Sequence, residues 1–144
     1  SLAEQEPQIH IVYPVHLNPN VQEPAYRLLN QLPNITLLPP LDYLSMVHLM
    51  KLAVLVLTDS GGIQEEATGL GVPTLVLREV TERPEGVEAG VLKLVGADEQ
   101  RIVSTAQRLL HDKAAYQQMA QAANPFGDGH AAEKIVAALL AYDA

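Results

Sequence analysis

The sequence VLVLTDSGGIQEEATGL at residues 54–70 carries the clearest evidence of fold class. Its first five residues, Val54–Thr58, form a continuous apolar run, as expected of a strand that is covered on both faces in a parallel sheet. Two glycines follow, and a helical pattern continues to Leu70. A strand, a glycine turn and a helix in this order are typical of parallel α/β proteins.

The same alternation continues on both sides of this segment. Short apolar runs predict further strands at 9–13, 35–38, 74–77 and 91–95, and amphipathic patterns predict helices at 20–32, after Asp42, and at 98–111, 113–123 and 130–142. Asn20, with Glu23 three residues later, is the predicted N-cap of the first helix, and Asp42 caps the second. Residues 78–90 are predicted to form a long charged loop.

This order of elements predicts an α/β fold with one Rossmann-like, doubly wound parallel sheet and helices on both faces. We expect a single domain over residues 1–144. In such sheets ligands bind beyond the carboxyl ends of the strands, so candidate site residues are sought there.

Composition and charge exclude several classes of protein. Of the 144 residues 48% are apolar and 18% are charged, which is typical of a globular domain. Nine basic and seventeen acidic side chains give a net charge of −8, the wrong sign for binding a nucleic-acid backbone. No apolar run approaches the roughly 20 residues of a membrane span, and no secretory signal is visible. The absence of cysteine excludes disulfides and is compatible with a cytoplasmic location.

The candidate site of highest interest follows the strand at 54–58. Gly61 and Gly62 allow a ligand to approach the backbone closely or the backbone to adopt positive φ, and the N-terminus of the next helix favours an anion. Ser60 can donate to a phosphate oxygen, and Glu66 can accept from sugar hydroxyls. An ordinary strand-to-helix turn capped by Ser60 explains the same residues equally well.

Arg83 and His16 lie at the same predicted edge of the sheet. Arg83 can hold a diphosphate through two hydrogen bonds, although taken alone a solvated charged loop is the favoured interpretation. His16 follows the first strand and can act as a donor or an acid–base group, but a histidine between two prolines is more often structural. The spacing of the histidines indicates no metal site. The segment NPFGDG at 124–129 predicts a turn.

Four segments taken together resemble the non-hydrolysing UDP-N-acetylglucosamine 2-epimerases. They are PVHLNP (14–19), TDSGGIQEE (58–66), TERPE (81–85) and NPFGDG (124–129), in this order. The resemblance runs from about Ile9 to the end of the chain. It implies the carboxyl-terminal half of a two-domain fold of the glycosyltransferase-B type, with two Rossmann-like domains facing each other across a nucleotide-sugar cleft.

The family interconverts UDP-N-acetylglucosamine and UDP-N-acetylmannosamine without nicotinamide or metal. UDP is eliminated to leave a 2-acetamidoglucal and is then added back to the opposite face. Carried over to this chain, the resemblance implies that Ser60, Gly61 and Gly62 hold the diphosphate. It also implies that Glu66 accepts from the ribose hydroxyls and that Arg83 helps to bind UDP.

Three further positions are carried over from the family. His16 matches a histidine associated with a second, activating UDP-N-acetylglucosamine in bacterial members. Leu41 and Met46 match positions near the uracil that are often glutamine and phenylalanine in relatives. Because both are aliphatic here, base recognition is expected to rest on backbone groups and van der Waals contact.

The resemblance also implies that an amino-terminal domain carrying essential carboxylates is missing from this chain. We therefore expect the chain alone not to epimerise, and we place no catalytic residue in it. The family suggests a homodimer that makes a precursor of bacterial cell-surface polysaccharide. The last helix is expected to expose apolar surface and to favour self-association.

Other functions remain as alternatives at this point. The donor-binding half of a glycosyltransferase of the same fold is the nearest, and a requirement for an acceptor would identify it. A hydrolysing epimerase would release free N-acetylmannosamine. A receiver domain with Asp59 as phospho-acceptor ranks lower, because the first strand is followed by Pro14-Val15-His16 rather than an acidic pair, and Lys93 lies inside a strand.

Overall fold

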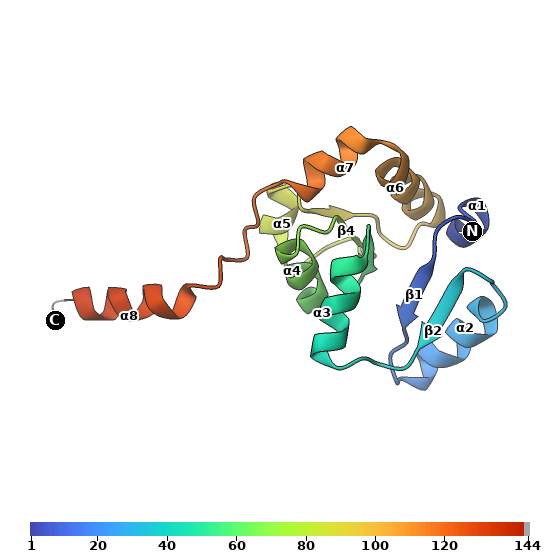
Figure 1. Cartoon of the computed structure of the whole chain (residues 1–144), viewed down its shortest axis with the longest axis horizontal. Coiled ribbons are helices and arrows are strands. Elements are labelled where there is room, and N and C mark those ends of the chain that lie inside the picture. Colours follow the sequence, from blue (N-terminus) through green and yellow to red (C-terminus); the bar gives the residue numbers. More distant parts are fainter. Residues whose placement is uncertain (143–144) are drawn as a thin grey trace. The chain divides into compact units, whose positions relative to one another are not determined.

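The computed structural model describes residues 1–142 of the chain (Figure 1). These residues belong to two compact units, Ser1–Leu52 and Ala53–Ala144. Every strand pair is parallel, and helices alternate with the strands up to the last strand, which three helices follow in succession. The predicted α/β class is therefore confirmed, whereas a single domain over residues 1–144 stays a prediction.

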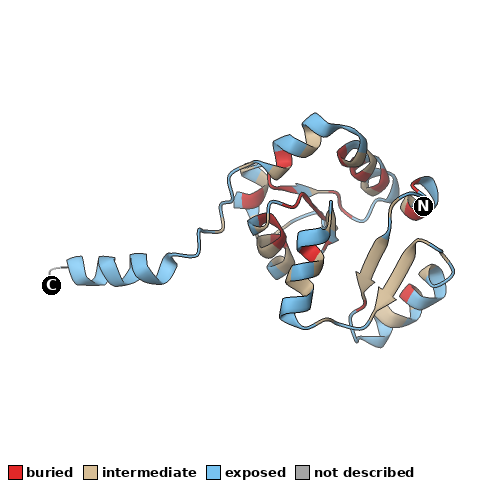
Figure 2. Cartoon of the chain, viewed as in Figure 1, coloured by how far each residue is buried: buried red, intermediate tan, exposed pale blue. Residues whose placement is uncertain are grey.

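The first unit is built around one parallel pair of strands. Its elements are α1 (Leu2–Gln5), β1 (Ile11–Pro14), α2 (Pro19–Leu29), β2 (Ile35–Leu38) and α3 (Tyr43–Leu52). In the β1–β2 ladder Ile11 lies opposite Ile35 and Pro14 opposite Leu38. α2 packs against β2, and both strands are half-buried along their whole length (Figure 2).

Polar side chains at the helix starts of this unit correct one prediction and confirm another. The N-cap of α2 is Asn18 rather than Asn20, because the Asn18 side chain accepts from the backbone N–H of Asn20 at 3.0 Å and Pro19 takes the first helical position. Asp42 caps α3 as predicted and accepts from Ser45 N at 3.0 Å. The hydrogen bond from the Ser45 hydroxyl is the main cause that lowers the pKa of Asp42.

The second unit contains a three-stranded parallel sheet with β4 in the centre. Its elements are β3 (Val56–Thr58), α4 (Gly61–Gly69), β4 (Thr74–Val76), α5 (Pro84–Glu88), β5 (Leu92–Leu94), α6 (Glu99–His111), α7 (Lys113–Ala120) and α8 (Ala131–Ala141). The sheet order is β3–β4–β5. All three residues of β4 are buried, as expected of the strand with neighbours on both sides.

A buried apolar cluster joins β4, β5 and a later turn. Val76 and Leu92 belong to this cluster, and Phe126 packs against it. Asn124 accepts from the backbone N–H of Phe126 at 3.1 Å, which closes an Asx turn. The prediction of a turn at 124–129 is confirmed, and this turn brings Phe126 to the core.

The predicted loop at 78–90 is wrong in part, because it contains the helix α5. Pro84 occupies the first helical position, Glu85 lies in the first turn, and Gly90 adopts positive φ (+80°) just beyond the end. These are ordinary start and stop signals of a helix. The high charge of the segment obscured them.

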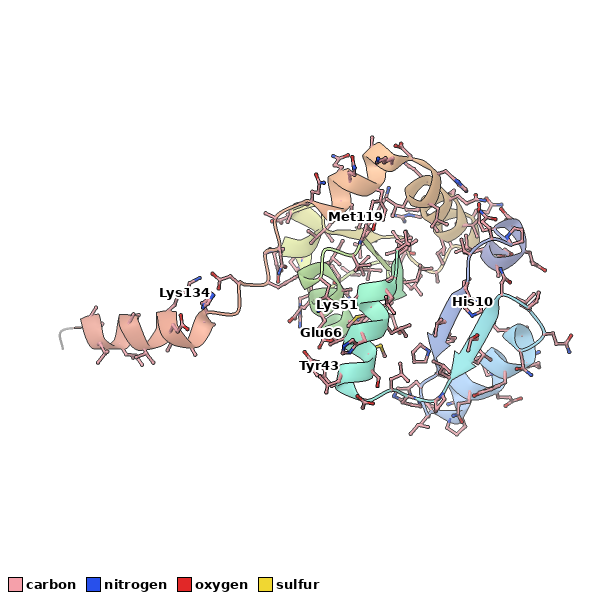
Figure 3. The ribbon with its side chains drawn as sticks, viewed as in Figure 1. His10, Tyr43, Lys51, Glu66, Met119 and Lys134 are labelled. Atoms are coloured by element: carbon pink, nitrogen blue, oxygen red, sulfur yellow. The ribbon has the colours of Figure 1, made fainter. Side chains whose placement is uncertain are left out.

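Helix α8 is exposed over its whole length (Figure 2). Leu139 and Leu140 are 70% and 83% exposed, so the expected apolar surface on the last helix is confirmed, while self-association stays a prediction. Near its start Lys134, labelled in Figure 3, forms an ion pair with Asp128 at 2.7 Å, which lowers the pKa of Asp128. Within residues 1–142 no helix is long and apolar enough to cross a membrane.

Gly86 in α5 leaves room for the apolar cluster. A Cβ built there would lie 2.5 Å from Cδ1 of Leu92 and 2.8 Å from Cζ of Phe126. We expect Gly86→Ala to lower the free energy of unfolding by about 1–3 kcal/mol through overpacking, measured by urea denaturation.

Gly62→Ala is the matched control, because a Cβ at Gly62 would meet nothing within 4 Å. Alanine is the better helix former, so this variant should not unfold more easily. Equal stability of the Gly86→Ala variant and the unsubstituted chain would contradict the packing assigned to Gly86.

Candidate functional site

The candidate site begins where β3 ends and α4 starts. The hydroxyl of the buried Thr58 accepts from the backbone N–H of Ser60 at 3.0 Å and shapes this turn. Ser60 is the N-cap of α4, yet its side chain makes no capping hydrogen bond. Since the first N–H groups of a helix have no partner within it, the start of α4 presents donors and the positive end of the helix dipole.

Gly61 and Gly62 contribute open space rather than an unusual backbone. Neither has positive φ, which corrects one of the two roles considered from the sequence. A Cβ built on Gly61 would lie 3.7 Å from Nη2 of Arg83, and one on Gly62 would meet nothing within 4 Å. The glycines therefore leave the start of α4 accessible to a ligand next to Arg83.

Arg83 comes from the segment between β4 and α5, and the structure brings it beside the glycine turn. Its Nε donates to Glu65 on α4, and its Nη1 donates to the backbone carbonyl of Glu82 at 3.0 Å. The hydrogen bond and the charge of Glu65 raise the pKa of Arg83. Arg83 is thus a permanent cation at the N-terminus of α4. Its positive charge and the positive end of the helix dipole both favour binding of an anion there.

Glu66 and Glu65 are neighbours on α4 with different surroundings. Both are half-buried, and Glu66 is labelled in Figure 3. Glu65 holds Arg83, although sequence analysis assigned it no function. The sequence contained one indication of this pair: Glu65 lies on the helix whose N-terminus forms the site, and Arg83 follows the next strand. The sugar contact expected of Glu66 stays a prediction.

The three remaining candidates belong to the first unit. His16 is exposed after β1, and its Nδ1 accepts from the backbone N–H of Asn18 at 3.1 Å. In the neutral ring the proton therefore lies on Nε2, which leaves a donor available. Leu41 precedes α3 and Met46 lies in it, both half-buried. The regulatory contact and the uracil contacts of these residues stay predictions.

In the part of the chain that the structure describes, the side chains that could bind a metal ion do not form a metal site. Within residues 1–142 no group of three or more His, Cys, Asp or Glu side chains is arranged to hold a metal ion. The chemistry offered by the site is instead that of anion binding, with one guanidinium, one hydroxyl and the first N–H groups of α4.

Comparison with known proteins gives a consistent result. The family model of UDP-N-acetylglucosamine 2-epimerase matches residues 1–140. The Escherichia coli K12 UDP-N-acetylglucosamine 2-epimerase is 56% identical over 138 residues, covering 96% of this chain and 37% of the relative. The Salmonella typhimurium LT2 enzyme of the same name is 54% identical over 141 residues, covering 98% and 38%.

A solved structure agrees with these relatives. The Neisseria meningitidis UDP-GlcNAc 2-epimerase, in a crystal structure bound to UDP-GlcNAc, matches with a TM-score of 0.91 and 47% identity, over 98% of this chain and 38% of that one. The α/β fold with parallel sheets is therefore that of the carboxyl-terminal part of a glycosyltransferase-B type fold. The chain spans about 38% of the length of such relatives. On this evidence the chain belongs to the UDP-N-acetylglucosamine 2-epimerase family.

Proposed function

We propose that this chain is the UDP-binding part of an enzyme that interconverts UDP-N-acetylglucosamine and UDP-N-acetylmannosamine. The observation that carries the proposal is the position of Arg83, with Nη2 beside Gly61 at the start of α4. In the Neisseria relative, 47% identical, the bound molecule is UDP-GlcNAc. A guanidinium and a helix N-terminus together match a diphosphate in charge and hydrogen-bonding capacity.

In this proposal the chain binds the leaving group. Ser60, Gly61 and Gly62 donate to the diphosphate through a hydroxyl and backbone N–H groups, and Arg83 neutralises its charge. Glu66 accepts from the ribose hydroxyls, while Leu41 and Met46 contact the uracil. In the reaction the C2 proton is removed and the bond from C1 to the diphosphate oxygen breaks, so UDP leaves with the bonding electrons. Stabilising that charge lowers the barrier to elimination.

The proton transfers are assigned to the rest of the whole enzyme. This chain spans only about 38% of its relatives, and we place in the remaining length the amino-terminal domain with its acid–base carboxylates. The whole enzyme would be a cytoplasmic bacterial homodimer that makes a precursor of cell-surface polysaccharide. His16 would contact a second, regulatory UDP-N-acetylglucosamine. No cofactor is invoked, because elimination and re-addition need only acid–base groups and charge stabilisation.

The first test is a titration of the chain with UDP, followed by amide NMR. We expect shifts concentrated at Ser60, Gly61, Gly62 and Arg83. Arg83→Ala should weaken UDP binding about tenfold, because a charge-assisted pair with the diphosphate is lost.

Arg78→Ala is the control for charge alone. Arg78 lies in the same segment and pairs with Glu82 at 3.7 Å, so the variant removes the same charge without removing the guanidinium beside Gly61. Its affinity for UDP should stay within about twofold of the unsubstituted chain, since exposed pairs contribute little. Equal weakening by both variants would argue against a specific site at Arg83.

Substitution of Glu66 should separate the contribution of the ribose to binding from that of the phosphates. Because its proposed partners are the ribose hydroxyls, Glu66→Ala should weaken binding of UDP and leave binding of pyrophosphate unchanged or tighter. Calorimetric titration with both ligands measures the difference. Parallel losses for UDP and pyrophosphate would show that Glu66 does not act through the ribose.

Activity provides a third measurement. With UDP-N-acetylglucosamine alone, this chain should form no UDP-N-acetylmannosamine in a proton NMR assay, because it lacks the proposed acid–base groups. The intact enzyme should form it without any acceptor. A need for an acceptor in the intact enzyme would favour the glycosyltransferase alternative.

A further inference from the structure

A buried amide on α4 faces the segment that carries Arg83. The Gln64 side chain is only 1% exposed, and its Oε1 accepts from the hydroxyl of Thr81 at 2.7 Å. A buried amide is costly unless it is hydrogen-bonded. The contact with Thr81 therefore ties the chain after β4 to the interior face of α4.

The Thr81 hydroxyl has a second hydrogen-bond partner, the backbone of Arg83. The same oxygen accepts from the backbone N–H of Arg83 at 3.1 Å. Thr81 is half-buried, whereas its neighbours Val80 and Glu82 are exposed. One hydroxyl thus connects a buried side chain of the helix to the backbone of the arginine, in a segment that is otherwise largely exposed.

Arg83 is held by α4 at two separate points. Its backbone is held through Gln64 and Thr81, and its side chain through the ion pair of Nε with Glu65. With Nε on Glu65 and Nη1 on the Glu82 carbonyl, Nη2 is the nitrogen that lies beside Gly61. Both attachments come from consecutive residues of the helix whose N-terminus forms the candidate anion site.

We infer that Gln64 and Thr81 are positioning residues that place Arg83 for recognition of a diphosphate. This inference rests on the proposed function, in which Arg83 binds the diphosphate of UDP. The Gln64–Thr81 contact fixes the position of the Arg83 backbone. The guanidinium therefore lies beside the glycine turn already in the absence of ligand. Ordering that segment beforehand removes an entropic cost that would otherwise reduce affinity.

The test uses a pair of substitutions at Thr81. Thr81→Val keeps the shape of the side chain and removes the hydroxyl, whereas Thr81→Ser keeps the hydroxyl and serves as the control. The first readout needs no ligand: hydrogen exchange of the Arg83 amide, measured by NMR, should be about tenfold faster in Thr81→Val and unchanged in Thr81→Ser. Thr81→Ala replaces Thr81→Val if the latter fails to fold.

The second readout is affinity for UDP. Thr81→Val should weaken it about fivefold, and Thr81→Ser should stay within about twofold, since only the first loses a hydrogen-bonded anchor. If Thr81 acts through Arg83, adding Thr81→Val to the Arg83→Ala variant should change the affinity no further. A merely structural role would instead lower affinity in both backgrounds.

The outcomes separate the inference from the proposed function. Unchanged exchange of the Arg83 amide in Thr81→Val, or weakening that persists without Arg83, overturns the positioning role alone. If the unsubstituted chain and Arg83→Ala bind UDP equally, or if neither binds, the proposed function fails, and the diphosphate part of this inference fails with it.

Discussion

Parallel pairing of β3 with β4 is the constraint on which the candidate site depends. In a parallel sheet neighbouring strands end at the same edge, so the residues that follow them are brought side by side. The ladder continues past the strands with a hydrogen bond from Leu77 N to the carbonyl of Thr58 at 3.0 Å. Because of this pairing, Gly61 after β3 and Arg83 after β4 are neighbours in space, with the Arg83 guanidinium 3.7 Å from where a Cβ on Gly61 would lie, although 22 positions separate them in the sequence.

The burial of β4 makes this pairing durable. Its three residues are buried, and it has a parallel neighbour on each side. Sheet hydrogen bonds and apolar burial therefore stabilise the edge of the sheet at which β3 and β4 end. Helix α4 begins at this edge and supplies the N–H donors of its first turn. The site residues themselves are exposed or half-buried, so they remain accessible to a ligand.

Charge within the site is balanced rather than purely positive. Glu65 keeps Arg83 in place and also competes with an anion for the same guanidinium. An acidic partner of this kind limits how strongly the free arginine attracts any passing anion, and it orients one edge of the guanidinium. The net charge of −8 acts in the same direction, because it repels polyanions that could otherwise bind at an arginine and a helix N-terminus.

The sequence by itself determined the α/β class, most of the strands and helices, and the family, because apolar periodicity and four ordered segments are local signals. The same segments predicted Ser60, Gly61, Gly62 and Arg83 as candidate site residues. It misplaced the N-cap of α2 and missed α5, where nearby polar or charged residues offered competing signals. Only the tertiary structure decided that Gln64, Thr81 and Glu65 hold Arg83 against α4. The Gln64–Thr81 and Glu65–Arg83 contacts join residues that are 17 and 18 positions apart in the sequence. Contacts over such separations depend on strand pairing and side-chain packing rather than on local sequence pattern.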